Sequence, residues 1–156
     1  MSLEIERKFL VKNTDFKTAS YQKKLVKQGY LNSDKSRTVR VRIADDKGFI
    51  TIKGKSNTAG TTRFEWEKEI NILEAEQLLL LCEPSIIDKT RFYIKSEHHI
   101  FEVDEFYSDN QGLIVAEIEL NSENEEFKKP SWLGKEVTGT AKYYNSSLSK
   151  NPFKNW

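Results

Sequence analysis

Four pairs of acidic residues, each pair separated by one residue, stand out in this sequence. They are Glu4/Glu6, Glu65/Glu67, Glu102/Asp104 and Glu117/Glu119. Residues two apart in a β-strand point to the same face about 6.5–7 Å from each other, so each pair can direct both carboxylates at one small volume. Carboxylate oxygens suit Mg²⁺, Mn²⁺ or Ca²⁺. Several such pairs on a curved sheet would repel one another without a cation, so they predict a divalent-metal site.

Basic residues show the same spacing. The stripes are formed by Arg40, Arg42, Lys53, Lys89 and Arg91. Arginine offers planar, paired donors and lysine a point charge, a combination that suits a polyanion such as a chain of phosphates. We therefore expect these side chains to hold an anion that the metal also contacts. The sequence contains no evident Ser/His/Asp arrangement that would indicate a covalent nucleophile.

The charged residues lie in segments whose side chains alternate between apolar and polar, which predicts β-strands. Eight are expected, at Leu3–Val11, Lys27–Asn32, Thr38–Ile43, Phe49–Lys55, Thr62–Ile70, Lys89–Lys95, Ile100–Tyr107 and Leu113–Leu120. Turn-forming residues join most of them, which indicates an antiparallel sheet, and closure into a barrel would remove its exposed edges. Helices are expected at Leu73–Cys82, after the cap Asn71, and at Ala141–Ser149, with a turn or short helix at Asp15–Ser20. The predicted class is α+β, mainly β.

Alternation leaves open which face of the barrel points inward. Charged strand faces commonly meet water, and an apolar interior would then suit a carrier of apolar ligands. A charged interior instead requires helices or a partner subunit to cover the apolar outside. The sorting of signs by strand favours the charged interior, because a solvent-facing surface gains little from stripes of like charge.

Composition limits the classes of partner. With 25 Lys and Arg against 24 Asp and Glu, the 156-residue chain has a formal net charge of +1, which gives no bulk attraction to nucleic acid or membranes. The length suits one domain, residues 1–156. Cys82 is the single cysteine, so no internal disulfide can form. Without a long apolar run or a signal-peptide pattern, a cytoplasmic location is expected.

Segments along the whole chain resemble, in order, the elements of CYTH-domain proteins, the triphosphate tunnel metalloenzymes. The first is Glu4-Ile5-Glu6-Arg7-Lys8, which resembles the ExExK signature of that family. Further matches are Thr38–Arg42, Thr51–Lys53, Arg63–Glu67, Asp88–Arg91, Phe101–Asp104, Ala116–Leu120, and Val137–Gly139 with Tyr143 and Asn145. The short bacterial inorganic triphosphatases resemble this chain most. Near the C-terminus, Thr140, Lys142 and Ser149 depart from the family pattern, which leaves open whether that segment gates the tunnel.

This resemblance implies an eight-stranded antiparallel barrel with a few covering helices and a tunnel that holds a triphosphate and a divalent metal. By position, the metal ligands would be Glu4, Glu6, Glu102, Asp104, Glu117 and Glu119. The substrate-binding residues would be Lys8, Arg40, Arg42, Lys53, Arg63, Lys89 and Arg91. Catalytic roles fall on Lys8, Glu65, Glu67 and Lys89, while Glu102 and Asp104 could instead position water or orient the bases. The implied metal is Mg²⁺ or Mn²⁺, with Ca²⁺ as an inhibitor.

The favoured function is metal-dependent hydrolysis of a small-molecule triphosphate, inorganic tripolyphosphate above all. Three alternatives stay open: conversion of ATP to cyclic AMP and pyrophosphate by a class IV adenylate cyclase, a thiamine triphosphatase, and non-enzymatic binding of polyphosphate or nucleotide. Neither nucleic acid nor membrane is expected as a partner. An apolar barrel exterior would allow a homodimer.

Overall fold

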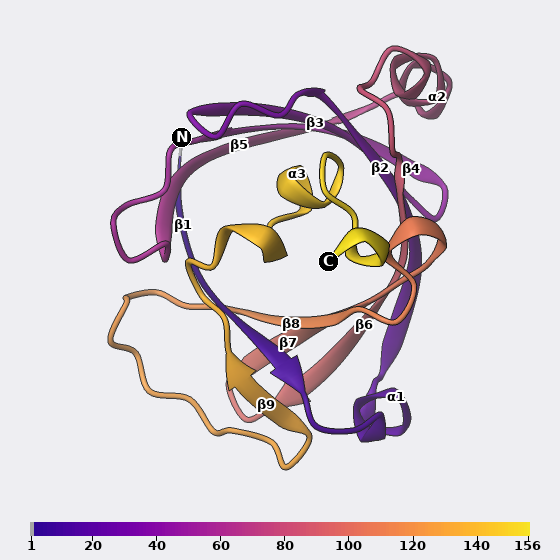
Figure 1. Ribbon diagram of the computed structural model, residues 1–156. Helices are drawn as coiled ribbons and strands as arrows, with labels where there is room; N and C mark the ends of the chain where they lie inside the picture. The colour runs from indigo at the N-terminus through magenta and orange to yellow at the C-terminus, as the bar shows by residue number, and fades with distance from the viewer. Residues whose placement is uncertain (1) are drawn as a thin grey trace.

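A closed antiparallel barrel dominates the structure, a computed structural model that describes residues 2–156 (Figure 1). The barrel strands are β1 (Ser2–Val11), β2 (Gln22–Asn32), β3 (Arg37–Ala44), β4 (Lys47–Gly54), β5 (Thr62–Ile70), β6 (Ile87–Ser96), β7 (His99–Phe106) and β8 (Ile114–Glu119). A short ninth strand is β9 (Leu133–Glu136), and the helices are α1 (Asp15–Ala19), α2 (Ile72–Leu80) and α3 (Asn145–Leu148). Single 3₁₀ turns lie at Ser108–Asn110, Ala141–Tyr143 and Phe153–Asn155.

β1 closes the barrel because it pairs with strands from both ends of the sheet. The strand order is β5-β4-β3-β2-β6-β7-β8-β1-β9, with a further pairing between β5 and β1. The first half of β1 pairs with β5, where Glu4 lies opposite Arg63. Its second half pairs with β8, where Glu6 lies opposite Glu119 and Lys8 opposite Glu117. The predicted eight-stranded antiparallel barrel is therefore confirmed.

The charged face of the sheet is the inner face. Lys89 is 2% exposed and Asp104 1% exposed, whereas Phe92 and Val103, which have the opposite parity on the same two strands, pack outside the barrel. A barrel with an apolar interior, the alternative that the sequence left open, is thus excluded. Arg7, the one charged residue on the apolar face of β1, lies outside and donates to Glu136 of β9 at 2.6 and 2.8 Å.

The apolar outside is covered by parts of the chain itself. Phe16 of α1 is fully buried and packs edge-on against Phe92 and Trp132, with ring centroids 5.4 and 5.9 Å apart. Trp132 precedes β9 and also contacts Phe101, at 5.4 Å. α2 lies across β3 and β4, and Gly48 permits this approach, because a Cβ there would lie 2.6 Å from the Cβ of Ala75.

The C-terminal segment enters the barrel and plugs one end of it (Figure 1). We refer to residues 141–149 as the plug. Leu148 is fully buried there, against Phe106 and Val115 on the inner face of the strands. The predicted continuous helix over Ala141–Ser149 is wrong: a 3₁₀ turn and α3 are separated by Tyr144, whose extended backbone (ψ 137°) breaks the hydrogen-bond ladder.

Other sequence-based boundaries change modestly. β2 begins at Gln22 rather than Lys27, because its first residues pair with β6 as far as Tyr93. β9 has no counterpart among the predicted strands and lies beside β1, at Phe9 and Val11. In the described part of the chain, no helix has the length and apolar character needed to span a membrane.

The outer cover gives a test of the fold. Replacing Phe16 by alanine should lower the free energy of unfolding by about 3–5 kcal/mol, because a buried ring is lost and a cavity remains. Leu80→Ala on α2 is the control, since Leu80 is 86% exposed and its loss should change stability by no more than about 0.5 kcal/mol. Urea unfolding followed by tryptophan fluorescence measures both. Equal effects of the two substitutions would contradict the packing of α1 on the barrel.

Candidate active site

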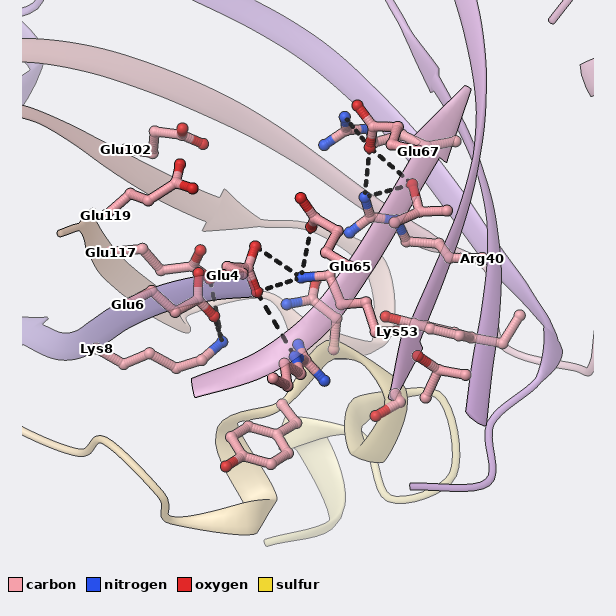
Figure 2. Close-up of a pocket in the computed structure, with 18 of the residues that line it drawn as sticks. Glu4, Glu6, Lys8, Arg40, Lys53, Glu65, Glu67, Glu102, Glu117 and Glu119 are labelled. Carbon is pink, nitrogen blue, oxygen red and sulfur yellow. Dashed lines mark hydrogen bonds and ion pairs between the residues drawn. The ribbon is translucent and has the colours of Figure 1, made fainter. Parts of the chain in front are cut away.

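A cavity of about 190 Å³ lies in the barrel interior, above the plug (Figure 2). All eight barrel strands and the plug contribute to its wall. The lining residues are Glu4, Glu6, Lys8, Tyr30, Thr38, Arg40, Arg42, Thr51, Lys53, Arg63, Glu65, Glu67, Lys89, Arg91, Glu102, Glu117, Glu119, Tyr144, Asn145 and Ser146. Seven of them are basic and seven acidic. With all groups ionised the wall carries no net charge, which suits an anion that enters together with a cation.

The β1–β8 side of the cavity concentrates carboxylates around one lysine. Lys8 Nζ lies 3.1 Å from Glu117 Oε1 and 3.7 Å from Glu6 Oε1. Burial raises the pKa of Glu6 to about 7, and the neighbouring charge of Glu117 acts in the same direction. Burial also opposes ionisation of Glu117, but Lys8 and Arg91 outweigh it and hold the pKa of Glu117 well below its ordinary value. Glu6 is therefore left without sufficient positive charge, and burial and Glu4 likewise raise the pKa of Glu119 opposite it.

Lys53 joins two acids on the opposite side of β1. Its Nζ donates to Glu4 at 2.8 Å and lies 3.3 Å from Glu65 Oε2, while Arg63 Nε lies 3.5 Å from Glu4 (Figure 2). Burial alone would raise the pKa of Glu4, but Lys53 and the hydrogen bond with Glu65 lower it to about 2. Burial and the adjacent Glu4 raise the pKa of Glu65. Of these two carboxyls, Glu65 is thus the one that binds a proton more readily.

Two arginines on β3 share a single carboxylate. Glu67 Oε2 accepts from Thr51 at 2.7 Å, from Arg42 at 3.3 Å and from Arg40 at 3.4 Å. The Nε atoms of Arg40 and Arg42 are buried and have no hydrogen-bond partner within residues 2–156. Burial, together with the charges of Arg40 and Arg91, lowers the pKa of Arg42 to about 10. The β3 side of the cavity therefore has more positive charge and more hydrogen-bond donors than Glu67 can pair.

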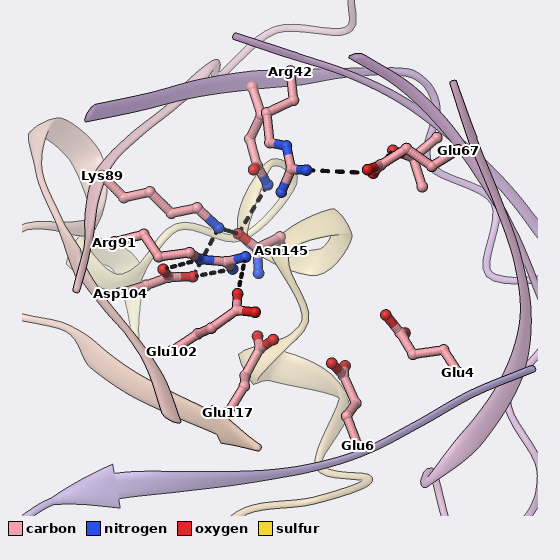
Figure 3. Close-up of polar contacts among 12 residues, drawn as sticks. Glu4, Glu6, Arg42, Glu67, Lys89, Arg91, Glu102, Asp104, Glu117 and Asn145 are labelled. Atoms are coloured by element: carbon pink, nitrogen blue, oxygen red, sulfur yellow. Dashed lines mark hydrogen bonds and ion pairs between the residues drawn. The ribbon is translucent and has the colours of Figure 1, made fainter. Parts of the chain in front are cut away.

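Asp104 lies behind the cavity wall and holds two bases in place (Figure 3). Its carboxylate accepts from Arg91 at 2.7 and 2.9 Å and from Lys89 at 2.8 Å. Arg91 also pairs with Glu102. Burial, reinforced by Arg91, lowers the pKa of Lys89 to about 7 even though Asp104 opposes that change. Of the fifteen residues expected from sequence to form the site, Asp104 is the one that does not line the cavity.

The acids fit a divalent cation that shares its ligands with a substrate. Within residues 2–156, no three side chains from His, Cys, Asp and Glu form a ready-made metal cluster. Mg²⁺ commonly binds through one or two carboxylates together with substrate phosphates and waters, so a protein cage is not needed. The raised pKa of Glu6 beside Glu117 is the electrostatic strain that such a cation would relieve.

Comparison with known proteins places this architecture in a family. Residues 2–152 match the CYTH domain. The chain belongs to the CYTH family. Membership implies a divalent metal, and the barrel with its charged interior is the CYTH fold.

Three relatives share nearly the full length of this CYTH domain. An inorganic triphosphatase of Acetivibrio thermocellus is 48% identical over 157 residues, covering 100% of this chain and 99% of the relative. One of Nitrosomonas europaea is 33% identical over 150 residues, covering 94% and 96%. The crystal structure of the inorganic triphosphatase NE1496 superposes with a TM-score of 0.63 at 32% identity, over 94% of this chain and 97% of that one.

Six lining residues were not among the site residues expected from sequence: Tyr30, Thr38, Thr51, Tyr144, Asn145 and Ser146. Thr38 and Thr51 could have been found, because they share strand parity with Arg40 and Lys53. Periodicity gave no signal for Tyr144, Asn145 and Ser146, because it does not show that the plug turns into the barrel; only the resemblance to the C-terminal family pattern pointed to Asn145.

The strain at Glu6 predicts a pH-dependent stability. Its folded pKa lies above the ordinary 4.5, so Glu6 lowers stability progressively as pH rises from about 4.5 to about 7. Glu6→Gln should therefore unfold less readily than the wild type above pH 7, by roughly 2–3 kcal/mol, and match it below pH 4.5. Urea unfolding in EDTA at pH 4, 6 and 8 measures this. The exposed Glu69→Gln on β5 is the control, and equal pH profiles for Glu6→Gln and the wild type would contradict the assignment.

Proposed function

We propose that this protein is a divalent-metal-dependent triphosphatase that hydrolyses inorganic tripolyphosphate to phosphate and pyrophosphate. The observation that carries the proposal is the closed ring of seven bases and seven acids around one small cavity. Such a ring matches a compact polyanion bound with a cation better than it matches either alone. The inorganic triphosphatases among its relatives, aligned over nearly their whole length, support the same substrate class.

The basic residues would divide between binding and catalysis. Arg40 and Arg42 offer unused Nε donors to phosphate oxygens, and Lys53, Arg63 and Arg91 add charge around the cavity. Hydrogen bonds from a charged guanidinium group to phosphate are shorter and stronger than those from neutral donors. Lys8 and Lys89 would both contact substrate and take catalytic roles, since Lys8 lies among acids and Lys89 has a pKa of about 7. The substrate would therefore be held from several strands at once.

Glu6, Glu117, Glu119, Glu4 and Glu102 are the proposed metal ligands, with Mg²⁺ or Mn²⁺ as the active ion and Ca²⁺ as an inhibitor. When bound, the ion would neutralise phosphate charge and make water more acidic. For Asp104 the structure supports the other role that the resemblance allowed, orientation of bases, because both of its oxygens already accept from Arg91 and Lys89. We therefore assign Asp104 to positioning Arg91 and Lys89 rather than to binding the metal.

In the proposed reaction, water attacks the terminal phosphorus and the bond to the bridging oxygen breaks. The water proton passes to a carboxylate, for which Glu65 is the candidate because its raised pKa makes it the better proton acceptor of the Glu4/Glu65 pair. Glu67 would hold Arg40 and Arg42 in line with the phosphates. Phosphoryl transfer depends mainly on such positioning and charge stabilisation, which this rigid ring supplies.

Several expectations from sequence stay as predictions alongside this function. They are one domain over residues 1–156, a cytoplasmic location, a homodimer, and the lack of nucleic-acid or membrane partners. A class IV adenylate cyclase, a thiamine triphosphatase and a non-enzymatic binding protein would use the same tunnel. No feature of the cavity favours any of the three over tripolyphosphate hydrolysis.

A substrate panel separates these functions. The protein should release phosphate from tripolyphosphate with Mg²⁺ or Mn²⁺, faster than from ATP or thiamine triphosphate, and Ca²⁺ should suppress the reaction. Phosphate, pyrophosphate and cyclic AMP are measured for each pair of substrate and metal. Cyclic AMP as the main product from ATP would overturn the hydrolase function, and saturable binding without turnover would assign a binding protein.

Substitutions on one strand test where the substrate lies. Arg40→Ala should lower kcat/KM for tripolyphosphate by about a hundredfold or more, because it removes a charged donor from the transition state. Arg37→Ala on the same strand is the matched control; Arg37 is exposed outside the cavity, paired with Asp34, and its loss should leave the rate unchanged. Glu119→Ala should lower activity similarly through the metal. Full activity in Arg40→Ala would contradict substrate binding at this wall.

A further inference from the structure

The plug carries a side chain into the active-site cavity. Asn145 lines the cavity and lies beside Lys89 and Gln28 (Figure 3). Its Oδ1 accepts from Lys89 Nζ at 3.0 Å and from Gln28 Nε2 at 2.9 Å. One amide oxygen thus receives two donors, from β6 and from β2, so the plug is tied to the barrel from inside.

Lys89 determines which way this amide points. Lys89 lies 2.8 Å from the Asp104 carboxylate, and in this charged pair its ammonium has only donors, so the atom of Asn145 that faces it is the oxygen. Gln28 must then also present its amide nitrogen, which leaves its own oxygen buried without a hydrogen-bond partner in residues 2–156. Leaving a buried acceptor without a hydrogen bond costs free energy, so another contact must offset that cost. The orphaned oxygen of Gln28 is therefore the mark of a fixed Asn145 orientation.

The fixed orientation leaves the other end of Asn145 for a ligand. With Oδ1 held by two donors, the amide nitrogen Nδ2 is turned away from them, and within residues 2–156 it donates no hydrogen bond to the protein. Asn145 lines the same cavity as Arg42, Arg91 and Glu117. A neutral donor there adds a hydrogen bond to an anion without adding repulsion among the buried bases.

We propose that Asn145 is a further substrate-binding residue, whose Nδ2 donates to a phosphoryl oxygen while its Oδ1 positions Lys89. The inference rests on the proposed triphosphatase function and adds to it that the plug forms part of the substrate site. Gln28, buried and out of reach of the substrate, is a positioning residue that acts through Asn145.

Two substitutions separate the donor role from the structural one. Asn145→Asp keeps an oxygen for Lys89 and Gln28, removes the donor and adds a negative charge, so a residue that merely held Lys89 would tolerate it. Asn145→Leu removes both the donor and the oxygen that holds Lys89 without adding charge, so an effect shared by the two variants follows from the lost donor. Asn151→Asp is the matched control, because Asn151 is exposed on the same segment and lies outside the cavity.

With Mg²⁺ and tripolyphosphate, we expect KM to rise roughly ten- to a hundredfold in both Asn145 variants. We expect kcat to fall less in Asn145→Asp than in Asn145→Leu, because Asp still holds Lys89. Asn151→Asp should match the wild type, and thermal melting checks that each variant is folded. Unchanged KM in Asn145→Leu, whatever Asn145→Asp shows, would overturn the donor role and leave the triphosphatase function standing.

Binding measured without turnover keeps the two proposals distinguishable. Calorimetry with tripolyphosphate and Ca²⁺, the ion expected to bind without supporting turnover, reports affinity even if the wild type hydrolyses nothing. Weaker binding by both Asn145→Asp and Asn145→Leu than by the wild type would support the contact although the proposed hydrolysis had failed. Equal binding would overturn the contact, and a wild type that binds no tripolyphosphate would overturn both proposals.

Discussion

The burial of charge inside a closed barrel is the constraint on which the rest of the structure depends. Ionised side chains taken out of water must be paired, and a buried pair gains little stability over apolar packing. Here the pairing is spread over several strands, so that Lys8, Lys53 and Arg91 each face acids from a neighbouring strand. Pairing is incomplete at Glu6 and at the Nε atoms of Arg40 and Arg42. Those unsatisfied groups are where a metal–phosphate complex adds most.

A charged interior forces the apolar residues outward, and the chain must then build its core outside the barrel. α1, β9 and the segment before β9 do this on one side, through Phe16 and Trp132. α2 covers β3 and β4. Much of the apolar packing thus lies outside the barrel, and the apolar residues of the inner face, such as Phe106 and Val115, gather around Leu148 at the plugged end.

The plug joins these two regions. Leu148 packs in an apolar layer at the end of the barrel, and three residues earlier Asn145 reaches the charged layer above it. A backbone break at Tyr144 makes this possible, because a continuous helix would place its side chains differently. Gly60 allows Gly139, just before the plug, to pass close by, because a Cβ at Gly60 would lie 2.4 Å from Gly139 Cα. One short segment thus closes the fold and completes the cavity.

The sequence by itself determined the eight barrel strands, their alternation and fourteen of the fifteen expected cavity residues, because side-chain parity is a local property of an extended chain. Parity could not show that the charged face turns inward, since this depends on α1, α2 and β9 covering the other face. Nor could it show that Asp104 binds Arg91 and Lys89 behind the wall, which follows from cross-strand contacts. Asn145 joins the site only because the plug folds back into the barrel, and that return is held by contacts between residues far apart in the chain.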